Sequence, residues 1–141
     1  MAAVQEFLRR EGIAGALAGL LQADALAAQQ AGRLDEAEQA YRQALSQDPK
    51  AFVAHVNLGV VLHDQGRLED AADSFDNALA INPDVAEVHY GLGLVLQDRD
   101  EKADAEAAFR RAVEIIEAIG ETVASPAEAR EIFGLSGSAS A

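Results

Sequence analysis

The feature that most constrains this chain is a pattern that recurs every 34 residues. A shift of 34 places Pro49 on Pro83 and Gly32 on Gly66. The same shift aligns two alanine series and one aromatic series: Ala37, Ala71 and Ala105; Ala44, Ala78 and Ala112; Tyr41, Phe75 and Phe109. A period of about 20–50 residues is typical of solenoids, in which similar units stack on one another. We therefore expect a stack of related units.

Each period contains two amphipathic runs at helical spacing, for example 51–64 and 68–80. The short turn Gln65-Gly66-Arg67 separates these two runs. Half of the 141 residues are hydrophobic but only 5% are aromatic, which favours Ala- and Leu-rich helices over a β-sandwich. The sequence predicts an all-α fold in which each repeat is a helical hairpin.

Small and large residues alternate where the two helices of a hairpin must meet. Ala71 and Ala78 permit a close approach, and Phe75 between them fills the space beside these small side chains. A side chain at Gly59 would push the helices apart, and Gly66 supplies the left-handed turn that ends the first helix.

These residues resemble the tetratricopeptide repeat, whose pattern pairs a Leu-Gly step with a downstream Ala, an aromatic residue and a closing Pro. The middle repeat carries the pattern as His55, Leu58, Gly59, Leu62, Gly66, Ala71, Phe75, Ala78 and Pro83. The resemblance implies three tetratricopeptide helical hairpins in a right-handed α-solenoid.

The repeats are expected at 18–51, 52–85 and 86–119, with an N-terminal helix within 1–17 and a capping helix and disordered tail within 120–141. Capping segments at the ends of a solenoid are expected to differ from the repeats.

The outer repeats depart from the pattern. The first has Asp24 and Ala25 where Leu and Gly are expected. The third has Asp100 for the turn Gly and Glu117 for the closing Pro. Without that Pro, the last helix can continue towards Gly120.

The two flanks each carry a helix signal. Val4, Phe7 and Leu8 share one face of the N-terminal helix, which could cover the first repeat, enter the binding groove or self-associate with a second copy. Ser125 and Pro126 are typical of a helix start, so a short capping helix is expected over 126–133.

The formal charge of −13 is unevenly distributed. Residues 1–50 carry 5 basic and 7 acidic groups, whereas residues 51–141 carry 6 and 17. A negative field repels phosphate backbones and anionic lipids, so nucleic acid and membranes are disfavoured as partners.

No catalytic or metal site is expected. The absence of cysteine excludes a disulfide, a thiolate ligand and a thiol nucleophile. His55 and His89 are one period apart, His63 stands alone, and no serine has a plausible base and orienting acid. The sequence therefore predicts no cofactor and no enzymatic activity.

The apolar run 13–21 after Arg9 and Arg10 has some features of a secretory leader. Glu6 and Glu11 are atypical of such leaders, and the run is too short to span a bilayer. We expect a cytoplasmic protein, and the starting Met and the Gly/Ser/Ala-rich tail are expected to be natural ends.

In the family that this sequence resembles, the first helices of successive repeats line a concave groove that holds a partner segment. By the resemblance, that groove is built here from Gln22, Leu26, Gln29, Val53, Val56, Asn57, Val60, His63, Tyr90, Leu94 and Gln97. An apolar strip with acidic surroundings suits a peptide or an amphipathic helix with apolar anchors and some basic residues.

One subgroup of the family binds the C-terminal carboxylate of chaperones through Lys, Asn and Arg side chains. The matching places in this chain hold Gln22, Leu26, Asn57, Glu87 and Gly91. Only the asparagine is kept and Glu87 would repel an anion, so this function is not expected.

The sequence thus predicts a protein-protein interaction scaffold or adaptor. Self-association through the N-terminal helix would make it a homodimer. Three alternatives remain: a secretion-type chaperone for an apolar partner, a self-assembling structural protein, and the recognition domain of a larger transferase.

Overall fold

The structure of the protein, a computed structural model, describes residues 2–3, 6 and 14–120. Residues 14–120 form six α-helices joined by short turns, and no strand occurs in this range. The helices are α2 (Ala14–Gln30), α3 (Leu34–Gln47), α4 (Phe52–Asp64), α5 (Leu68–Ile81), α6 (Ala86–Asp98) and α7 (Lys102–Ala118). The expected self-association residues Val4, Phe7 and Leu8, and the expected capping helix at 126–133, lie outside the described residues.

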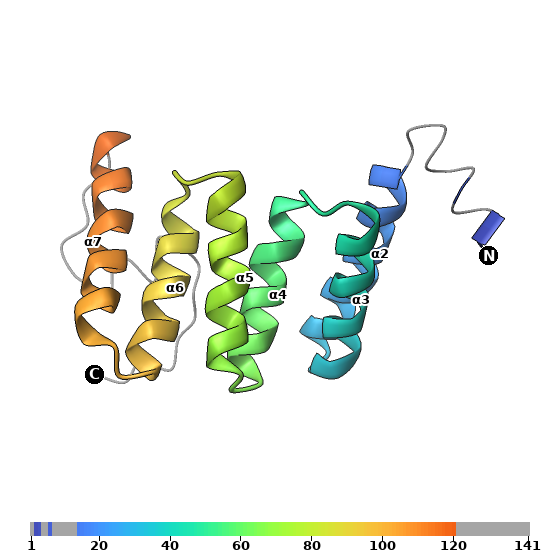
Figure 1. Cartoon of the computed structure of the whole chain (residues 1–141), viewed down its shortest axis with the longest axis horizontal. Helices are drawn as coiled ribbons and strands as arrows, with labels where there is room; N and C mark the ends of the chain where they lie inside the picture. Colours follow the sequence, from blue (N-terminus) through green and yellow to red (C-terminus); the bar gives the residue numbers. More distant parts are fainter. Residues whose placement is uncertain (1, 4–5, 7–13, 121–141) are drawn as a thin grey trace. The chain divides into compact units, whose positions relative to one another are not determined.

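The chain divides into two compact units, residues 1–83 and residues 84–141. Unit 1 contains the hairpins α2–α3 and α4–α5, and α3 packs against α4 as well as against α2. Unit 2 contains the hairpin α6–α7 (Figure 1). The all-α hairpin architecture predicted from the repeat is confirmed.

The three hairpin turns share one backbone arrangement. Gly32 and Gly66 have φ of 80° and 77°, in the left-handed region that glycine adopts without a steric penalty. In each turn, the third residue after the end of the helix donates its N–H to a carbonyl in the helix's last turn, as from Arg67 to Leu62 at 2.9 Å. The third turn places Asp100 at the left-handed position, with φ 61°.

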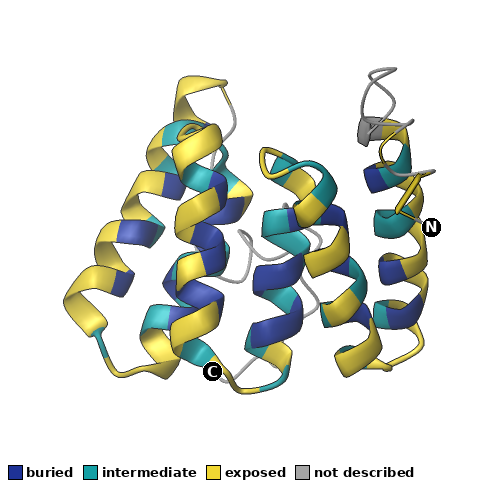
Figure 2. Ribbon diagram, turned by 45° about the vertical axis from the view of Figure 1, so that its right-hand side comes forward, coloured by how far each residue is buried: buried dark blue, intermediate teal, exposed yellow. Residues whose placement is uncertain are grey.

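Helices meet closely at the glycines that recur in the second and third hairpins. A Cβ added at Gly59 would lie 2.9 Å from the ring of Phe75, and one at Gly93 would lie 2.5 Å from the ring of Phe109. Buried residues lie along the helix sides that face each other within a unit (Figure 2). The small residue is therefore needed because an aromatic ring occupies the space in front of it.

The positions of the prolines determine where the second helix of a hairpin ends. Helix α5 stops at Ile81, and Asn82 before Pro83 has extended dihedral angles of −139° and 103°. Helix α7 has 17 residues, whereas α3 and α5 each have 14. The expectation that the last helix continues towards Gly120 in the absence of a proline is confirmed.

Candidate partner-binding surface of the first unit

The first helices of the two hairpins in unit 1, α2 and α4, contact each other and carry most of the residues expected to bind a partner. We call the following set the α2–α4 face: Gln22, Leu26 and Gln29 of α2, with Val53, Val56, Asn57 and Val60 of α4. Within each helix these residues recur at spacings of three or four, so they lie along one side of it.

The α2–α4 face presents uncovered apolar side chains. Leu26 is 42% exposed and Val53 is 56% exposed, and both are among the large hydrophobic residues that are exposed in the described part of the chain. Val56 and Val60 are half-buried and provide a partly covered floor beside them. An apolar patch of this kind on a folded unit is a common sign of a binding surface.

Two amide side chains of the same face are tied to a buried tyrosine. The hydroxyl of Tyr41, on α3, donates a hydrogen bond to Oε1 of Gln29 at 2.9 Å. Tyr41 is fully buried, and a hydrogen bond also joins its hydroxyl to the side chain of Asn57. One phenol group therefore connects α2, α3 and α4.

The ionisation of Tyr41 reports this environment. Burial of the hydroxyl raises the pKa of Tyr41 above its ordinary value of 10.0, and the hydrogen bond with Asn57 lowers it by a smaller amount.

In unit 2, Tyr90 and Leu94 stand 34 residues after Val56 and Val60 but have different surroundings. Tyr90 is only 4% exposed and packs with Ala112, Phe109 and Leu94. The rings of Tyr90 and Phe109 have their centroids 5.3 Å apart. The structure thus places Tyr90, which the sequence assigned to partner binding, in the packing of the α6–α7 hairpin, because the large ring fills space beside the small Ala112.

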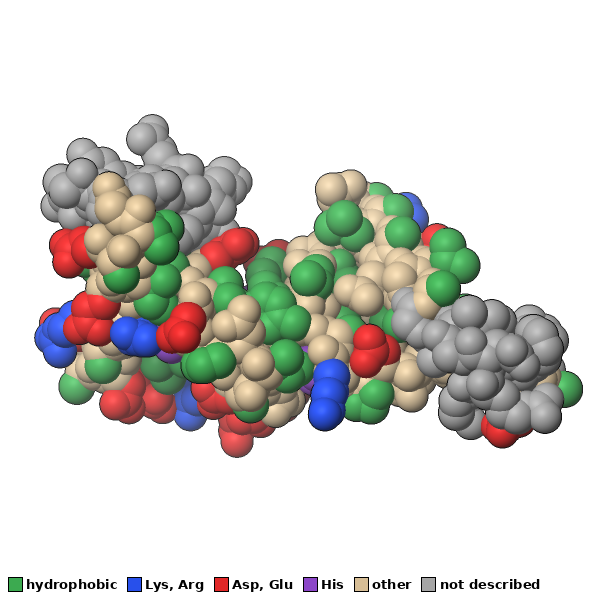
Figure 3. Space-filling model, turned by 90° about the horizontal axis from the view of Figure 1, so that it is seen from above, with side chains coloured by type: hydrophobic (Ala, Val, Ile, Leu, Met, Phe, Trp, Pro, Cys, Tyr) green, Lys and Arg blue, Asp and Glu red, His purple; other side chains and the backbone are tan. Residues whose placement is uncertain are grey.

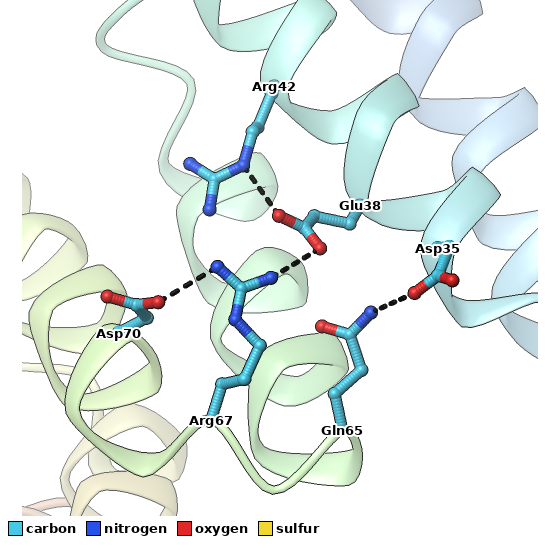
Figure 4. A network of polar contacts seen from close by, with 6 residues as sticks. All are labelled: Asp35, Glu38, Arg42, Gln65, Arg67 and Asp70. Atoms are coloured by element: carbon cyan, nitrogen blue, oxygen red, sulfur yellow. Dashed lines mark hydrogen bonds and ion pairs between the residues drawn. The ribbon is translucent and has the colours of Figure 1, made fainter.

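A polar network that the sequence reasoning missed joins the two hairpins of unit 1 (Figure 4). Arg67, in the α4–α5 turn, bonds Glu38 of α3 at 2.7 Å and Asp70 of α5 at 2.9 Å. Gln65 of the same turn donates to Asp35 at 2.8 Å, and Arg42 bonds Glu38 at 2.9 Å. The opposite charges of Arg67 and Glu38, 29 residues apart, were the only hint of this network in the sequence.

No group of three or more potential ligands gathers to form a metal site within the described residues. His55 instead donates from Nε2 to the carbonyl oxygen of Pro49 at 2.9 Å and so ties the loop between the two hairpins to α4. Among the same residues, no helix is long and apolar enough to cross a membrane.

Acidic groups are abundant at the surface. Figure 3 shows carboxylates and hydrophobic side chains next to one another in the view from above, with fewer basic side chains among them.

Solved structures with the same fold are described as MamA. One crystal structure of MamA superposes with a TM-score of 0.71 at 20% sequence identity, over 72% of this chain and 60% of that chain. A second structure, MamA MSR-1 C2, has a TM-score of 0.69 and 27% identity over 82% of this chain and 67% of that one. The chain thus spans less than two thirds of the first of these proteins.

Comparison with curated protein sequences finds no significant match. The sequence profile of the tetratricopeptide repeat, in contrast, matches residues 23–86 and 64–120, which together cover more than half of the chain. Such repeats generally serve as scaffolds for protein-protein interaction, not as catalysts. The chain belongs to the tetratricopeptide repeat family.

Proposed function

We propose that this protein is a binding scaffold that holds a segment of another protein against the α2–α4 face. The observation that carries the proposal is the pair of exposed apolar side chains, Leu26 and Val53, on two helices in contact. Water is displaced from both when an apolar anchor of the partner covers them, which supplies the driving force for association.

The negative charge of the chain limits which kind of partner segment can bind. The chain has 24 acidic and 11 basic residues, so a basic segment is attracted and an acidic one repelled. The partner segment therefore carries apolar anchors together with lysine or arginine residues. A scaffold of this kind explains the fold and the surface without requiring a catalytic group.

The test is a selection of binding peptides from a display library on the whole chain, followed by affinity measurements with the selected peptide. Val53→Asp places a charge at the centre of the apolar contact and is expected to weaken the affinity about tenfold or more. Because Val53 is exposed, the melting temperature is expected to stay close to that of the parent protein.

Leu20→Asp provides the matched control. Leu20 is 67% exposed on α2 but is six residues from Leu26, which places the two side chains about 120° apart around the helix. Both variants add one charge to an exposed apolar site, and only Val53→Asp should reduce binding. Equal affinities for the two variants would contradict the proposal.

A further inference from the structure

Helix α2 has the composition of a helix that is covered on all sides, although it is the first helix of unit 1 (Figure 1). Its 17 residues include a single charged side chain, Asp24. Helix α4 is similarly poor in charge and contacts α2, α3 and α5, whereas α2 contacts only α3 and α4 among the described helices of unit 1. A helix that is apolar all round is normally buried. The side of α2 that these neighbours leave open therefore needs a cover.

This open side carries exposed apolar side chains. We call the following set the outer side of α2: Ala16, Leu20, Ala23 and Ala27, which recur at spacings of four, three and four and are all exposed. Leu20 is 67% exposed. At about 100° per residue, the set is centred opposite Ala18 and Ala25, which are fully buried. The outer side is thus an apolar surface that faces away from the rest of the hairpin.

The segment before α2 has a complementary pattern. Val4, Phe7 and Leu8 share one side of a helix by their spacing. Ala2 and Glu6 are helical and exposed, and the same 100° rotation places them on the opposite side of that helix. Residues 1–83 form one compact unit. The exposed positions of this segment are thus those that would stay in water if its apolar side covered α2.

We propose that segment 4–8 packs antiparallel on the outer side of α2 of the same chain. Gly12 stands between the two and allows the chain to reverse its direction. Val4 is eight residues before Gly12 and Leu20 is eight residues after it. Equal numbers of residues advance equal lengths along two helices, so Val4 comes level with Leu20, and Phe7 lies between the levels of Ala16 and Leu20.

The size of the surface favours a segment of the same chain over a second copy. From Ala16 to Ala27 the outer side extends about 17 Å on a helix about 10 Å wide. It offers on the order of 200 Å², whereas a stable complex buries about 800 Å² on each partner. A tethered segment has an effective concentration in the millimolar range and needs less contact. Because Leu20 points about 120° away from Leu26, such a cover leaves the α2–α4 face open.

Thermal melting of the whole chain tests the contact with a matched pair of variants. Leu20→Ala and Leu26→Ala each remove an exposed leucine from α2, and leucine and alanine have similar helix propensities. Leu20→Ala is expected to lower the melting temperature by roughly 2–6 °C, and Leu26→Ala by less. Phe7→Ala should have an effect like that of Leu20→Ala. Combining these two should add little, since either one removes the contact, whereas Phe7→Ala and Leu26→Ala should be additive.

NMR identifies the occupant directly. The labelled whole chain should show NOEs between the methyl groups of Leu20 and the ring of Phe7, and an isotope-filtered spectrum of mixed labelled and unlabelled chains should lack them. NOEs in the filtered spectrum would mean that a second copy supplies the segment. Coupling of Phe7 to Leu26 instead of Leu20 would place the segment on the α2–α4 face. Unchanged melting in both Phe7→Ala and Leu20→Ala would leave the outer side uncovered. Each of these three results would overturn the proposal, and none of them depends on binding of a partner segment.

Discussion

Gly19 of α2 and Gly59 of α4 are helical glycines of unit 1 that have opposite surroundings. A Cβ at Gly59 would lie 2.9 Å from the buried ring of Phe75, whereas a Cβ at Gly19 would meet nothing within 4 Å. An alanine gains up to about 1 kcal/mol over glycine within a helix. At Gly59 this gain is opposed by overpacking, which typically costs about 1–3 kcal/mol.

We therefore predict that Gly59→Ala lowers the free energy of unfolding by roughly 0.5–2 kcal/mol. Gly19→Ala is the control and should raise the same quantity by about 0.5–1 kcal/mol. Urea denaturation followed by circular dichroism measures both. If Gly59→Ala were as stable as Gly19→Ala, the close approach to Phe75 would not constrain the hairpin.

Asp100 provides a second test at the scale of one residue. It occupies the left-handed position that Gly32 and Gly66 hold in the other turns, with φ 61°. Its carboxylate lies 3.8 Å from Lys102, but both side chains are more than 80% exposed, so this ion pair contributes little. The steric strain of the left-handed backbone therefore affects stability at this position more than the ion pair does.

Asp100→Gly is predicted to raise the free energy of unfolding by a few tenths to about 1 kcal/mol, because glycine removes the steric penalty of the left-handed conformation. Gly66→Asp makes the reverse exchange at the equivalent place and should lower stability. Thermal melting of the two variants checks both signs. A lower melting temperature for Asp100→Gly would show that the carboxylate has a structural role.

Among the elements, α3 and the α4–α5 turn are joined by charge as well as by packing. Burial alone raises the pKa of Glu38, but hydrogen bonds from Arg42 and Arg67 outweigh it, so the pKa lies below the ordinary value of 4.5. The folded state thus binds a proton less readily than the unfolded state. This contribution to stability is present above the unfolded-state pKa and is lost as the pH falls through the folded-state pKa.

We predict that Glu38→Gln reduces the loss of stability on acidification, because glutamine cannot be protonated in this range. The melting temperatures of parent and variant should converge as the pH falls below the ordinary glutamate pKa of 4.5 and through the lower pKa of folded Glu38. Glu36→Gln is the control, since Glu36 lies outside this network, pairs with the exposed Arg33 at 2.7 Å and has a side chain that is 64% exposed. Convergence to the same extent in both variants would contradict a specific role for Glu38.

The next repeat does not reproduce this network. Ala72 stands at the place of Glu38, and Glu101 stands at the place of Arg67. An alanine carries no charge, so the ion pair cannot form there. Unit 2 instead uses Arg111 of α7, which bonds Asp84 at 2.7 Å and ties the second helix of the hairpin to the segment before α6.

At the scale of the whole molecule, each unit contains one of the two tyrosines. Tyr41 lies in unit 1 and Tyr90 in unit 2. Residues 14–83 of unit 1 form two hairpins, and residues 84–120 of unit 2 form one. In repeat proteins, stability grows with the number of repeats that pack on one another. Single-tyrosine variants therefore separate the two units spectroscopically.

We predict that the fluorescence of Tyr90, measured in Tyr41→Phe, changes at a lower urea concentration than the fluorescence of Tyr41, measured in Tyr90→Phe. Far-UV circular dichroism of both variants serves as the control for any general loss of stability. Coincident fluorescence transitions would mean that the two units unfold as one cooperative block.

Sequence reasoning predicted the hairpins well because their determinants are local or periodic. Helix α5 needs only its amphipathic pattern and Pro83, and the turn before it needs Gly66. Even the absence of a proline at Glu117 predicted that α7 continues. The binding surface was harder to predict, because periodicity indicates the side of a helix but not what covers that side.

By itself, the sequence determined the period, the helical hairpins, their turns and the glycines at close helix contacts, because each follows from spacing along the chain or from the backbone freedom of a single residue. Only the tertiary structure decided that Val53 is exposed while Tyr90 is packed against Phe109. It also brought Tyr41 to Gln29 and Arg67 to Glu38. These outcomes depend on distances between side chains of different helices, which no spacing within one helix contains.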